Sequence, residues 1–211
     1  MNKKIIAVGA TLVLSFGAIA ILGSSTSFAA RALTCAQGGT CVVGNTGPGG
    51  GTVCYVAPTT FTETGAPCGT GCRYLEVART SRKVQQHWTD VTAAWSGNTG
   101  NLIGTTTFSI GAGYSNTGSM ISQSGAGTSG AGSLAKAYRG PSGKADWFLP
   151  SKVELNELYL QRIVVGGFVN GQYWSSSENV QSEAWNQSLT NGFLANYGKL
   201  LTLYVRPVRA F

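Results

Sequence analysis

The chain has 211 residues, of which 30 are glycine and 11% are charged, and its formal net charge is +7. This length suffices for a hydrophobic core, and the composition is typical of a loop-rich extracellular β or α+β domain. Positive charge is scattered except at Arg79, Arg82 and Lys83, which we interpret as a solvated loop rather than an anion-binding patch. We therefore expect no nucleic-acid partner.

The N-terminus has the order of a secretory signal peptide. Lys3 and Lys4 precede an apolar run over residues 5–22, and small residues fill 23–30. Small residues at the −3 and −1 positions favour cleavage after Ala29. An uncleaved membrane anchor is the alternative, because the apolar run is long; we expect membrane contact only through such a segment.

Five cysteines lie in the first third of the exported part of the chain. In an exported protein they indicate disulfides, and their spacing favours two local bridges, Cys35–Cys41 and Cys68–Cys72. Cys54 would remain as a small buried hydrophobe inside the strand-like run GTVCYV. A four-cysteine zinc site is the alternative, disfavoured because no paired C-x-x-C spacing is present. The sequence leaves the connectivity open.

The first half of the chain contains few clear elements. Alternation predicts short strands at residues 52–56 and 73–78. Residues 79–95 are ambiguous between helix and loop, with Trp88 and Trp95 as expected core anchors. Glycine-rich residues 97–132 are followed by a clearer pattern, and we predict a first helix in two pieces: residues 116–123 and 133–138.

Residues 145–162, ADWFLPSKVELNELYLQR, predict the best-marked helix. Trp147 is an aromatic anchor before it. Ser151 at the N-cap and Glu154 three residues later can form a capping box. Apolar residues then recur on one helical face: Leu155, Leu158, Tyr159 and Ile163.

Strand-like runs follow this helix: residues 173–175, 184–189, 193–197 and 200–211. Asn191 and Gly192 form a hairpin turn signal between the second and third runs. Pro207 indicates a sheet edge or a bulge within the last run.

Several motifs occur in an order that points to one family: GNTGPGGGTVCYV, RYLEVA, IGAGYSNTGSMI, ADWFLPSKVELNELY, YWSSSE, Ala184-Trp185 and YVRPVRAF. As a set they resemble the Legionella collagen-like (Lcl) C-terminal domain family, a domain of unknown function. The resemblance covers residues 44–211. It leaves a signal peptide at 1–29 and a cysteine-containing lead-in at 30–43.

The resemblance implies an α+β, C-type-lectin-like fold, with paired N- and C-terminal strands in an antiparallel sheet, two flanking helices and long loops. Residues 52–56 would lie beside 203–209, and the helix from Ser151 would pack Leu155 and Leu158 against the sheet. Cys54 departs from the aromatic residue expected at its position. Proteins similar to this family are often exported or surface-displayed, and its adhesins bind sulfated polysaccharide.

Catalytic chemistry finds little support in the sequence. His87 is the only histidine, and the serines at 175–177 have no G-x-S-x-G around them. Glu178 and Glu183 are the only carboxylate pair near one expected loop, as a glycosidase requires; a salt bridge from Glu178 or Asp146 to Arg206 or Arg209 is the favoured interpretation.

Metal and cofactor chemistry is disfavoured as well. Trp185-Asn186-Gln187 is similar to the tryptophan-asparagine-aspartate element of calcium lectins, but Gln187 replaces the acid. Formylglycine-generating oxidases, which share a related fold, need cysteines in the C-terminal half, and none follows Cys72. We expect no cofactor and no metal.

A polar, aromatic-containing surface over residues 178–203 remains as the predicted ligand site, with adaptable side chains of the kind that paratopes use. Its candidate contacts are Glu178, Asn179, Gln181, Asn186, Gln187, Asn191, Asn196 and Tyr197. The alternative is that these are ordinary solvated hairpin residues. Residues assigned to stability are Trp147, Ser151, Glu154, Trp174, Trp185, Arg206 and Arg209.

The sequence thus predicts a secreted or cell-surface bacterial envelope protein, with the periplasm as a further possibility. We expect a non-enzymatic module that binds a glycan or an extracellular protein. A structural envelope domain without a soluble ligand is the alternative.

Overall fold

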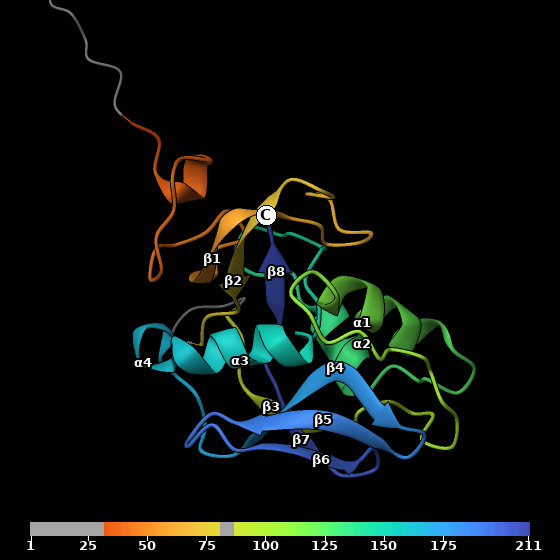
Figure 1. Cartoon of the computed structure of the whole chain (residues 1–211). Coiled ribbons are helices and arrows are strands. Elements are labelled where there is room, and N and C mark those ends of the chain that lie inside the picture. Colours follow the sequence, from red (N-terminus) through yellow and green to blue (C-terminus); the bar gives the residue numbers. More distant parts are fainter. Residues whose placement is uncertain (1–31, 81–86) are drawn as a thin grey trace, which may run out of the picture. The chain divides into compact units, whose positions relative to one another are not determined.

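The computed structural model describes residues 32–80 and 87–211, which belong to one compact unit (Figure 1). The expected signal peptide, residues 1–29, lies outside the described residues, as do Arg82 and Lys83 of the basic cluster. Arg79 is exposed. Among the helices that the structure describes, none has the length and apolar character needed to cross a bilayer.

Two sheets form the α+β architecture. A three-stranded antiparallel sheet has the order β1-β2-β8, and a five-stranded sheet has the order β3-β7-β4-β5-β6. In the second sheet β4 and β7 run parallel, while the other neighbours are antiparallel. The strands are β1 (Thr52–Phe61), β2 (Cys72–Val77), β3 (Val91–Ala93), β4 (Gln172–Val180), β5 (Glu183–Ser188), β6 (Leu194–Gly198), β7 (Leu203–Val205) and β8 (Val208–Ala210).

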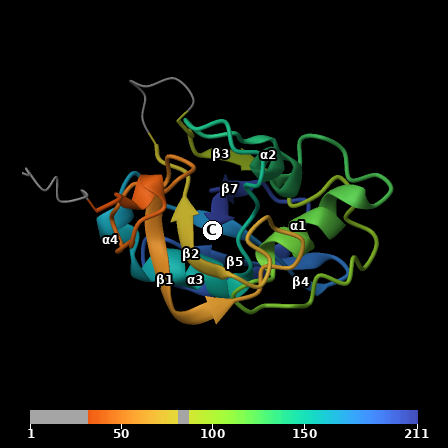
Figure 2. The ribbon, with the colours of Figure 1, turned by 90° about the horizontal axis from the view of Figure 1, so that it is seen from above.

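The N- and C-terminal strands share the three-stranded sheet, as expected, but their order differs from the prediction. The neighbour of β8 is β2, with Glu76 opposite Arg209, and not β1. The reason is that β1 forms a hairpin with β2 on one side. On its other side Val53 donates to the carbonyl of Asn45 at 2.9 Å, so the segment just after the lead-in, residues 44–45, occupies that edge (Figure 2).

The prediction of one long final strand over residues 200–211 is wrong. Two short strands, β7 and β8, lie there and belong to different sheets. Pro207 between them has no N–H for a ladder, and its carbonyl instead accepts from Ala78 N at 2.9 Å. The C-terminal segment therefore links the two sheets.

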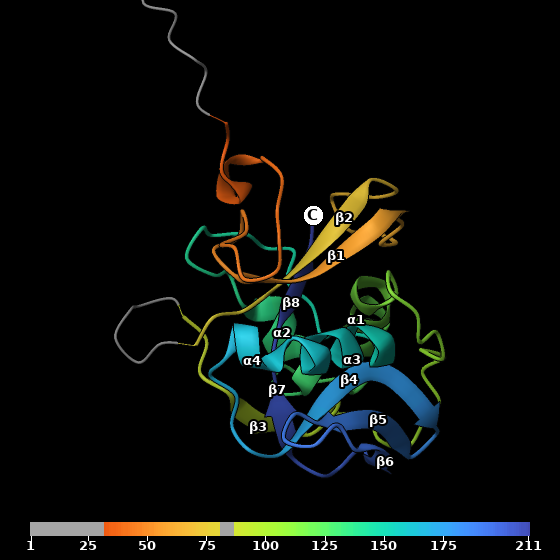
Figure 3. The same cartoon turned by 60° about the vertical axis from the view of Figure 1, so that its left-hand side comes forward.

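Within residues 32–80 and 87–211, four α-helices and a short 3₁₀ helix accompany the sheets: α1 (Gly113–Ser122), α2 (Ala131–Ala137), α3 (Lys152–Leu160), α4 (Arg162–Val165) and η1 (Cys35–Gln37). The glycine-rich stretch separates α1 from α2, as predicted. Two flanking helices were expected from the family resemblance; the larger number arises because both predicted helices are broken. Figures 1 and 3 show α3 between the β1–β2 hairpin and the β4–β5–β6 strands.

The capping box of α3 is formed as predicted. Ser151 Oγ accepts from Glu154 N at 3.3 Å, and Glu154 Oε2 accepts from Ser151 N at 2.8 Å. Leu155 and Leu158 are buried. Ile163 was expected on the same apolar face but is 82% exposed, because α3 ends at Leu160 and the chain turns before α4.

Two large hydrophobic clusters fill the interior of the described part of the chain, and a third, smaller one joins Cys35, Cys41 and Val53. The first joins the three-stranded sheet, α3 and one face of the five-stranded sheet: its largest members include Leu75, Phe148, Leu155, Leu158 and Tyr173. The second packs α1 and α2 against the other face: it includes Trp95, Met120, Leu149, Trp174 and Val205, with Trp88 at its margin. The central strands β4 and β7 are thus covered on both faces.

Two disulfides and one free cysteine lie in the described part of the chain. Disulfides join Cys35 to Cys41 and Cys68 to Cys72. Cys54 is free and buried, and its burial raises the pKa of the thiol.

The expected ion pair between Asp146 and Arg209 is present at 2.7 Å, and Arg209 also contacts Glu76 at 2.8 Å. Arg206 pairs with Asp90. Glu178 was expected to pair with an arginine, but its partner is the buried Lys199.

Candidate ligand-binding face

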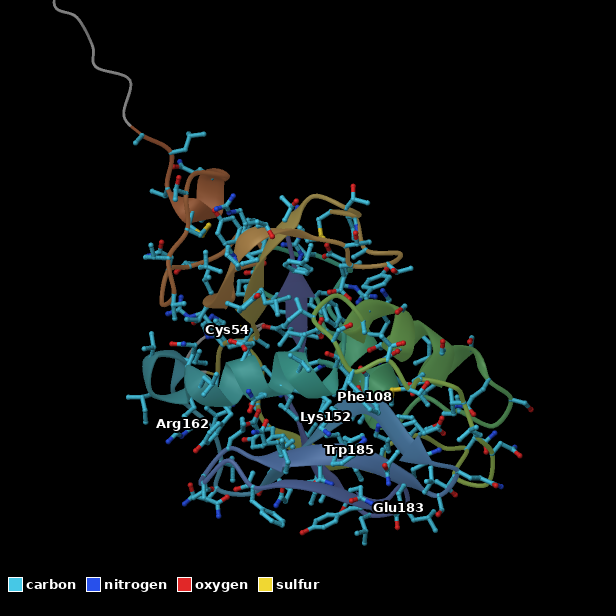
Figure 4. All side chains as sticks on the ribbon, in the orientation of Figure 1. Cys54, Phe108, Lys152, Arg162, Glu183 and Trp185 are labelled. Atoms are coloured by element: carbon cyan, nitrogen blue, oxygen red, sulfur yellow. A yellow bond between two sulfur atoms is a disulfide. The ribbon has the colours of Figure 1, made fainter. Side chains whose placement is uncertain are left out.

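The candidate site is built on the outward side of β5, where side chains alternate between two environments. Ala184 points into the second hydrophobic cluster. Glu183 and Trp185 therefore point the other way, toward solvent and the start of α3. We call the surface formed by Phe108, Asn179, Glu183, Trp185, Asn196 and Lys152 the β5 face (Figure 4).

An aromatic and cationic cluster lies at one end of this face. Lys152 Nζ is 3.2 Å from the centre of the Trp185 ring and 5.3 Å from that of Phe108. The two rings meet edge to face with centroids 6.2 Å apart. Such geometry allows a cation–π attraction, and desolvation by burial lowers the pKa of the Lys152 ammonium.

Backbone hydrogen bonds hold this cluster in place. Lys152 is the first residue of the capped helix α3, so the capping box fixes where its side chain emerges. The carbonyl of Phe108 accepts from Val153 N at 2.9 Å. The loop that carries Phe108 is thereby fastened to the first turn of α3. The backbone of the cluster is thus fixed; Phe108 is exposed, Lys152 and Trp185 are partly exposed, and the indole nitrogen of Trp185 is buried.

Two amides surround a carboxylate at the other end of the β5 face. Glu183 Oε2 accepts from Asn179 Nδ2 at 3.3 Å and also from Asn196 Nδ2. In the described part of the chain no lysine or arginine pairs with Glu183. Amides and a carboxylate offer both donors and acceptors in a small area.

The predicted contacts divide between this face and other places. Asn179 and Asn196 lie on the β5 face. Gln181 is exposed in the turn between β4 and β5, where its Nε2 donates to the carbonyl of Gly100. Asn191 is exposed at the opposite end of β5, and its Oδ1 accepts from Phe193 N at 3.1 Å.

The remaining predicted contacts lie wholly or partly inside the fold. Glu178 is fully buried, paired with Lys199, and accepts from the backbone N–H of Gly104 at 2.8 Å. Asn186 and Gln187 are also buried, and Gln187 Nε2 donates to Asn156 Oδ1 on α3 at 2.9 Å. Tyr197 is partly buried against the second cluster. Glu178 and Gln187 thus hold the hairpin from within, whereas the Asn186 amide is buried with no hydrogen-bond partner among the described residues.

Sequence reasoning missed Phe108 and Lys152 and assigned Trp185 to stability. Trp147 and Trp174 are fully buried, whereas Trp185 is only partly buried. The alternation of β5 carried a usable signal, because Trp185 must oppose its neighbour Ala184. Phe108 gave no local signal, since only the tertiary fold brings it to Trp185.

A second concave surface lies beside α4 and has a volume of about 310 Å³. Its lining combines a guanidinium, an aromatic ring and polar groups: Arg162, Ile163, Gly166, Gly167, Phe168, Asn170, Leu189 and Thr190. Arg162 stacks on Tyr159 at 4.1 Å and donates to the Tyr159 carbonyl at 3.0 Å. The guanidinium is therefore partly committed to its own helix.

Two of the three serines at 175–177 donate to the backbone, while the Ser176 hydroxyl is buried with no hydrogen-bond partner among the described residues. Ser175 Oγ donates to the carbonyl of Trp185 at 2.8 Å, and Ser177 Oγ donates to that of Thr107 at 3.2 Å. No hydrogen bond among the described residues joins His87 to these serines. Within residues 32–80 and 87–211, no three His, Cys, Asp or Glu side chains are grouped as metal ligands.

Comparison with known proteins gives similarity to solved structures alone. No family model matches the chain, and no curated protein matches it, so the resemblance to the Lcl domain stays a prediction. A fimbrial protein from Bacteroides ovatus of known crystal structure aligns with 76% of this chain at 18% identity and a TM-score of 0.49. The chain covers 44% of that protein, and at this similarity no functional inference passes between them.

Proposed function

We propose that this chain is an exported, non-enzymatic binding module that recognises a glycan through the β5 face. The observation that carries the proposal is the grouping of Trp185 and Phe108 with Glu183 and Asn196 on one solvent-facing surface. The proposal therefore rests on the geometry of the β5 face, which the resemblance to the Lcl domain family did not supply.

The chemistry of the β5 face suits a sugar. A sugar ring has an apolar C–H surface that can lie on an aromatic ring, and its hydroxyls both donate and accept hydrogen bonds. Trp185 and Phe108 supply ring surface, while Glu183 and the amides of Asn179 and Asn196 supply acceptors and donors. Lys152 adds an ammonium over the face of the Trp185 ring.

Export and surface display are supported by the two disulfides. Disulfides persist in oxidising compartments and are rare in the cytosol, and the structure contains both Cys35–Cys41 and Cys68–Cys72. The charge and hydropathy order of residues 1–29 adds a sequence argument for secretion. We place the mature protein outside the cell or on its surface.

The C-type-lectin-like fold of the Lcl domain is part of the same proposal. Its support is that the terminal strands share one sheet and that the capped helix packs Leu155 and Leu158 into the core. The broken C-terminal strand is the feature that departs from the expected pattern.

The test is a glycan array probed with the full chain, exported so that both disulfides form. Asn196→Ala and Trp185→Ala should each reduce binding to the selected glycan, by about tenfold for Asn196→Ala, because one hydrogen bond of about 1.5 kcal/mol is lost. Asn191→Ala is the matched control, since Asn191 is an exposed asparagine at the opposite end of β5. Unchanged binding in both site variants would overturn the site.

A structural envelope domain is the second candidate function. The observation that favours it is the open edge of the five-stranded sheet at β6, since an unpaired edge can join another chain. A chain that binds no glycan but is recovered in crosslinked assemblies from the cell surface would support this candidate over the first.

A further inference from the structure

The edges of the two sheets differ in how they are protected. An exposed strand edge presents unpaired N–H and C=O groups, and proteins usually block it with proline, charge, a bulge, shortness or a covering segment. β1 is covered by residues 44–45 at Val53 and contains Pro58 in its second half. β8 exchanges two backbone hydrogen bonds with Phe148, each 2.9 Å long, and β3 has only three residues.

β6 has none of these protections. It is the last strand in the order β3-β7-β4-β5-β6, so its outer edge pairs with no other strand in the described part of the chain (Figure 3). Its sequence, LANYG, contains neither proline nor a charged residue. Its pairing with β5 runs from Leu194 to Gly198 without a register shift, so no bulge twists the edge away.

Exposed apolar side chains lie at both ends of this edge. Phe193 precedes β6 and is 60% exposed. Leu200 and Leu201 follow it and are 76% and 52% exposed. A strand with apolar residues at each end is self-complementary when it meets a second copy in the antiparallel direction.

We propose that two copies of this chain pair antiparallel along β6. Pairing centred on Asn196 puts Leu194 opposite Gly198 of the other copy. Phe193 then lies against the Lys199–Leu200 segment of that copy, once at each end of the interface. Because β6 is uncharged, pairing brings no like charges together despite the positive net charge of the chain.

The symmetry of this dimer has a consequence for ligand binding, which rests on the proposed function. An isologous antiparallel pair has its two-fold axis perpendicular to the joined sheet. Both β5 faces therefore lie on the same side of that sheet. Two sites on one side can engage a single polymer, and avidity then exceeds the affinity of either site.

The test is sedimentation velocity of the full, disulfide-bonded chain over a concentration series without any glycan, so the result is independent of the proposed function. The wild-type chain should pass from monomer to dimer as concentration rises. The variant F193K/L200K should raise the dimerisation midpoint roughly tenfold or more, because like charges would meet at both ends of the interface. A wild-type chain that stays monomeric at every accessible concentration would overturn the proposal.

Two further variants make the test specific to β6. I163K/V164K places the same added charge on α4, where Ile163 and Val164 are 82% and 55% exposed, and should dimerise as the wild type does. A mixture of F193K/L200K with F193E/L200E should recover the dimer, since opposite charges then meet. If F193K/L200K dimerises with the wild-type midpoint, or if the mixture does not recover the dimer, the β6 interface is wrong.

Discussion

The three-stranded sheet and the β5–β6 end of the molecule use polar residues in opposite ways. Beside the three-stranded sheet, the buried Glu76 accepts from Gly49 N and Gly51 N at 2.8 and 2.9 Å and pairs with Arg209. On the β5 face, Glu183 is partly exposed and has only amide partners. A buried carboxylate with several hydrogen-bond and ionic partners stabilises the fold, whereas a partly exposed carboxylate with few partners can still bind a ligand.

The same contrast holds for strand edges. Residues 44–45 and Phe148 close the edges of the three-stranded sheet, while β6 leaves one edge of the larger sheet open among the described residues. Substitutions at the three-stranded sheet should therefore lower the free energy of unfolding and leave glycan binding intact. Substitutions at the β5–β6 end should weaken binding and leave the free energy of unfolding nearly unchanged.

The largest effect on stability is expected from Glu76→Ala. The change leaves Arg209 with one ionic partner and leaves the N–H groups of Gly49 and Gly51 without their acceptor. Breaking a buried pair in this way costs about 3–5 kcal/mol of unfolding free energy. Urea unfolding followed by tryptophan fluorescence measures it, and a loss below about 1 kcal/mol would contradict the role assigned to Glu76.

A pH-dependent effect is expected at Glu63, in the loop between β1 and β2. Glu63 is buried, accepts from Tyr114 N at 2.8 Å and interacts with Glu154. Burial first, and the charge of Glu154 second, raise the pKa of Glu63 from 4.5 to about 9. The folded state therefore retains a proton that the unfolded chain releases above pH 4.5.

The sign follows from this difference in bound protons. The contribution of Glu63 to stability is fully present below pH 4.5 and is lost as the pH rises toward 9. Glu63→Gln removes the titrating group but can still donate to Glu154. It should flatten the stability profile over this window and stabilise the fold at pH 8 by on the order of 2 kcal/mol. Denaturant unfolding from pH 4 to 9 checks this, with Glu183→Gln as the control that keeps the wild-type slope.

A smaller loss is expected from Ser151→Ala. The substitution removes the side-chain cap of α3 and should cost about 1 kcal/mol. Ser151→Thr keeps the hydroxyl and should recover most of that loss. Thermal unfolding of the two variants side by side provides the measurement; equal melting temperatures for alanine and threonine would mean that the cap does not stabilise α3.

The smallest effect on stability is expected from Asn196→Ala. Asn196 is exposed and its only partner among the described residues is Glu183. Surface substitutions of this kind usually change stability by less than about 0.5 kcal/mol, while glycan binding should fall about tenfold. Chemical unfolding and binding assays on the same preparation separate the two effects. A large stability loss with unchanged binding would place Asn196 with the structural residues.

Local chemistry explains which parts of the fold could be predicted. The α3 cap needs only Ser151 and Glu154, three residues apart, and it was predicted correctly. The break between β7 and β8 could not be placed, because the sheet that each piece joins depends on partners far along the chain. Pro207 indicated an interruption but not a change of sheet.

The candidate site, too, could be predicted only where local sequence determines it. Asn179 and Asn196 were expected at a ligand surface and lie on the β5 face. Glu178 belonged to the same predicted set, but Lys199 and two backbone N–H groups hold it inside. Phe108 and Lys152 entered the site only through tertiary contacts with Trp185.

The most direct test of the central claim is the glycan affinity of Trp185→Phe and Asn196→Ala beside that of Asn191→Ala, each measured on folded, disulfide-bonded protein. The β5 face predicts weaker binding for the first two variants and wild-type affinity for the third. Wild-type affinity in the first two variants, with loss confined to Asn191→Ala, would move the site to the opposite end of β5 and contradict this assignment.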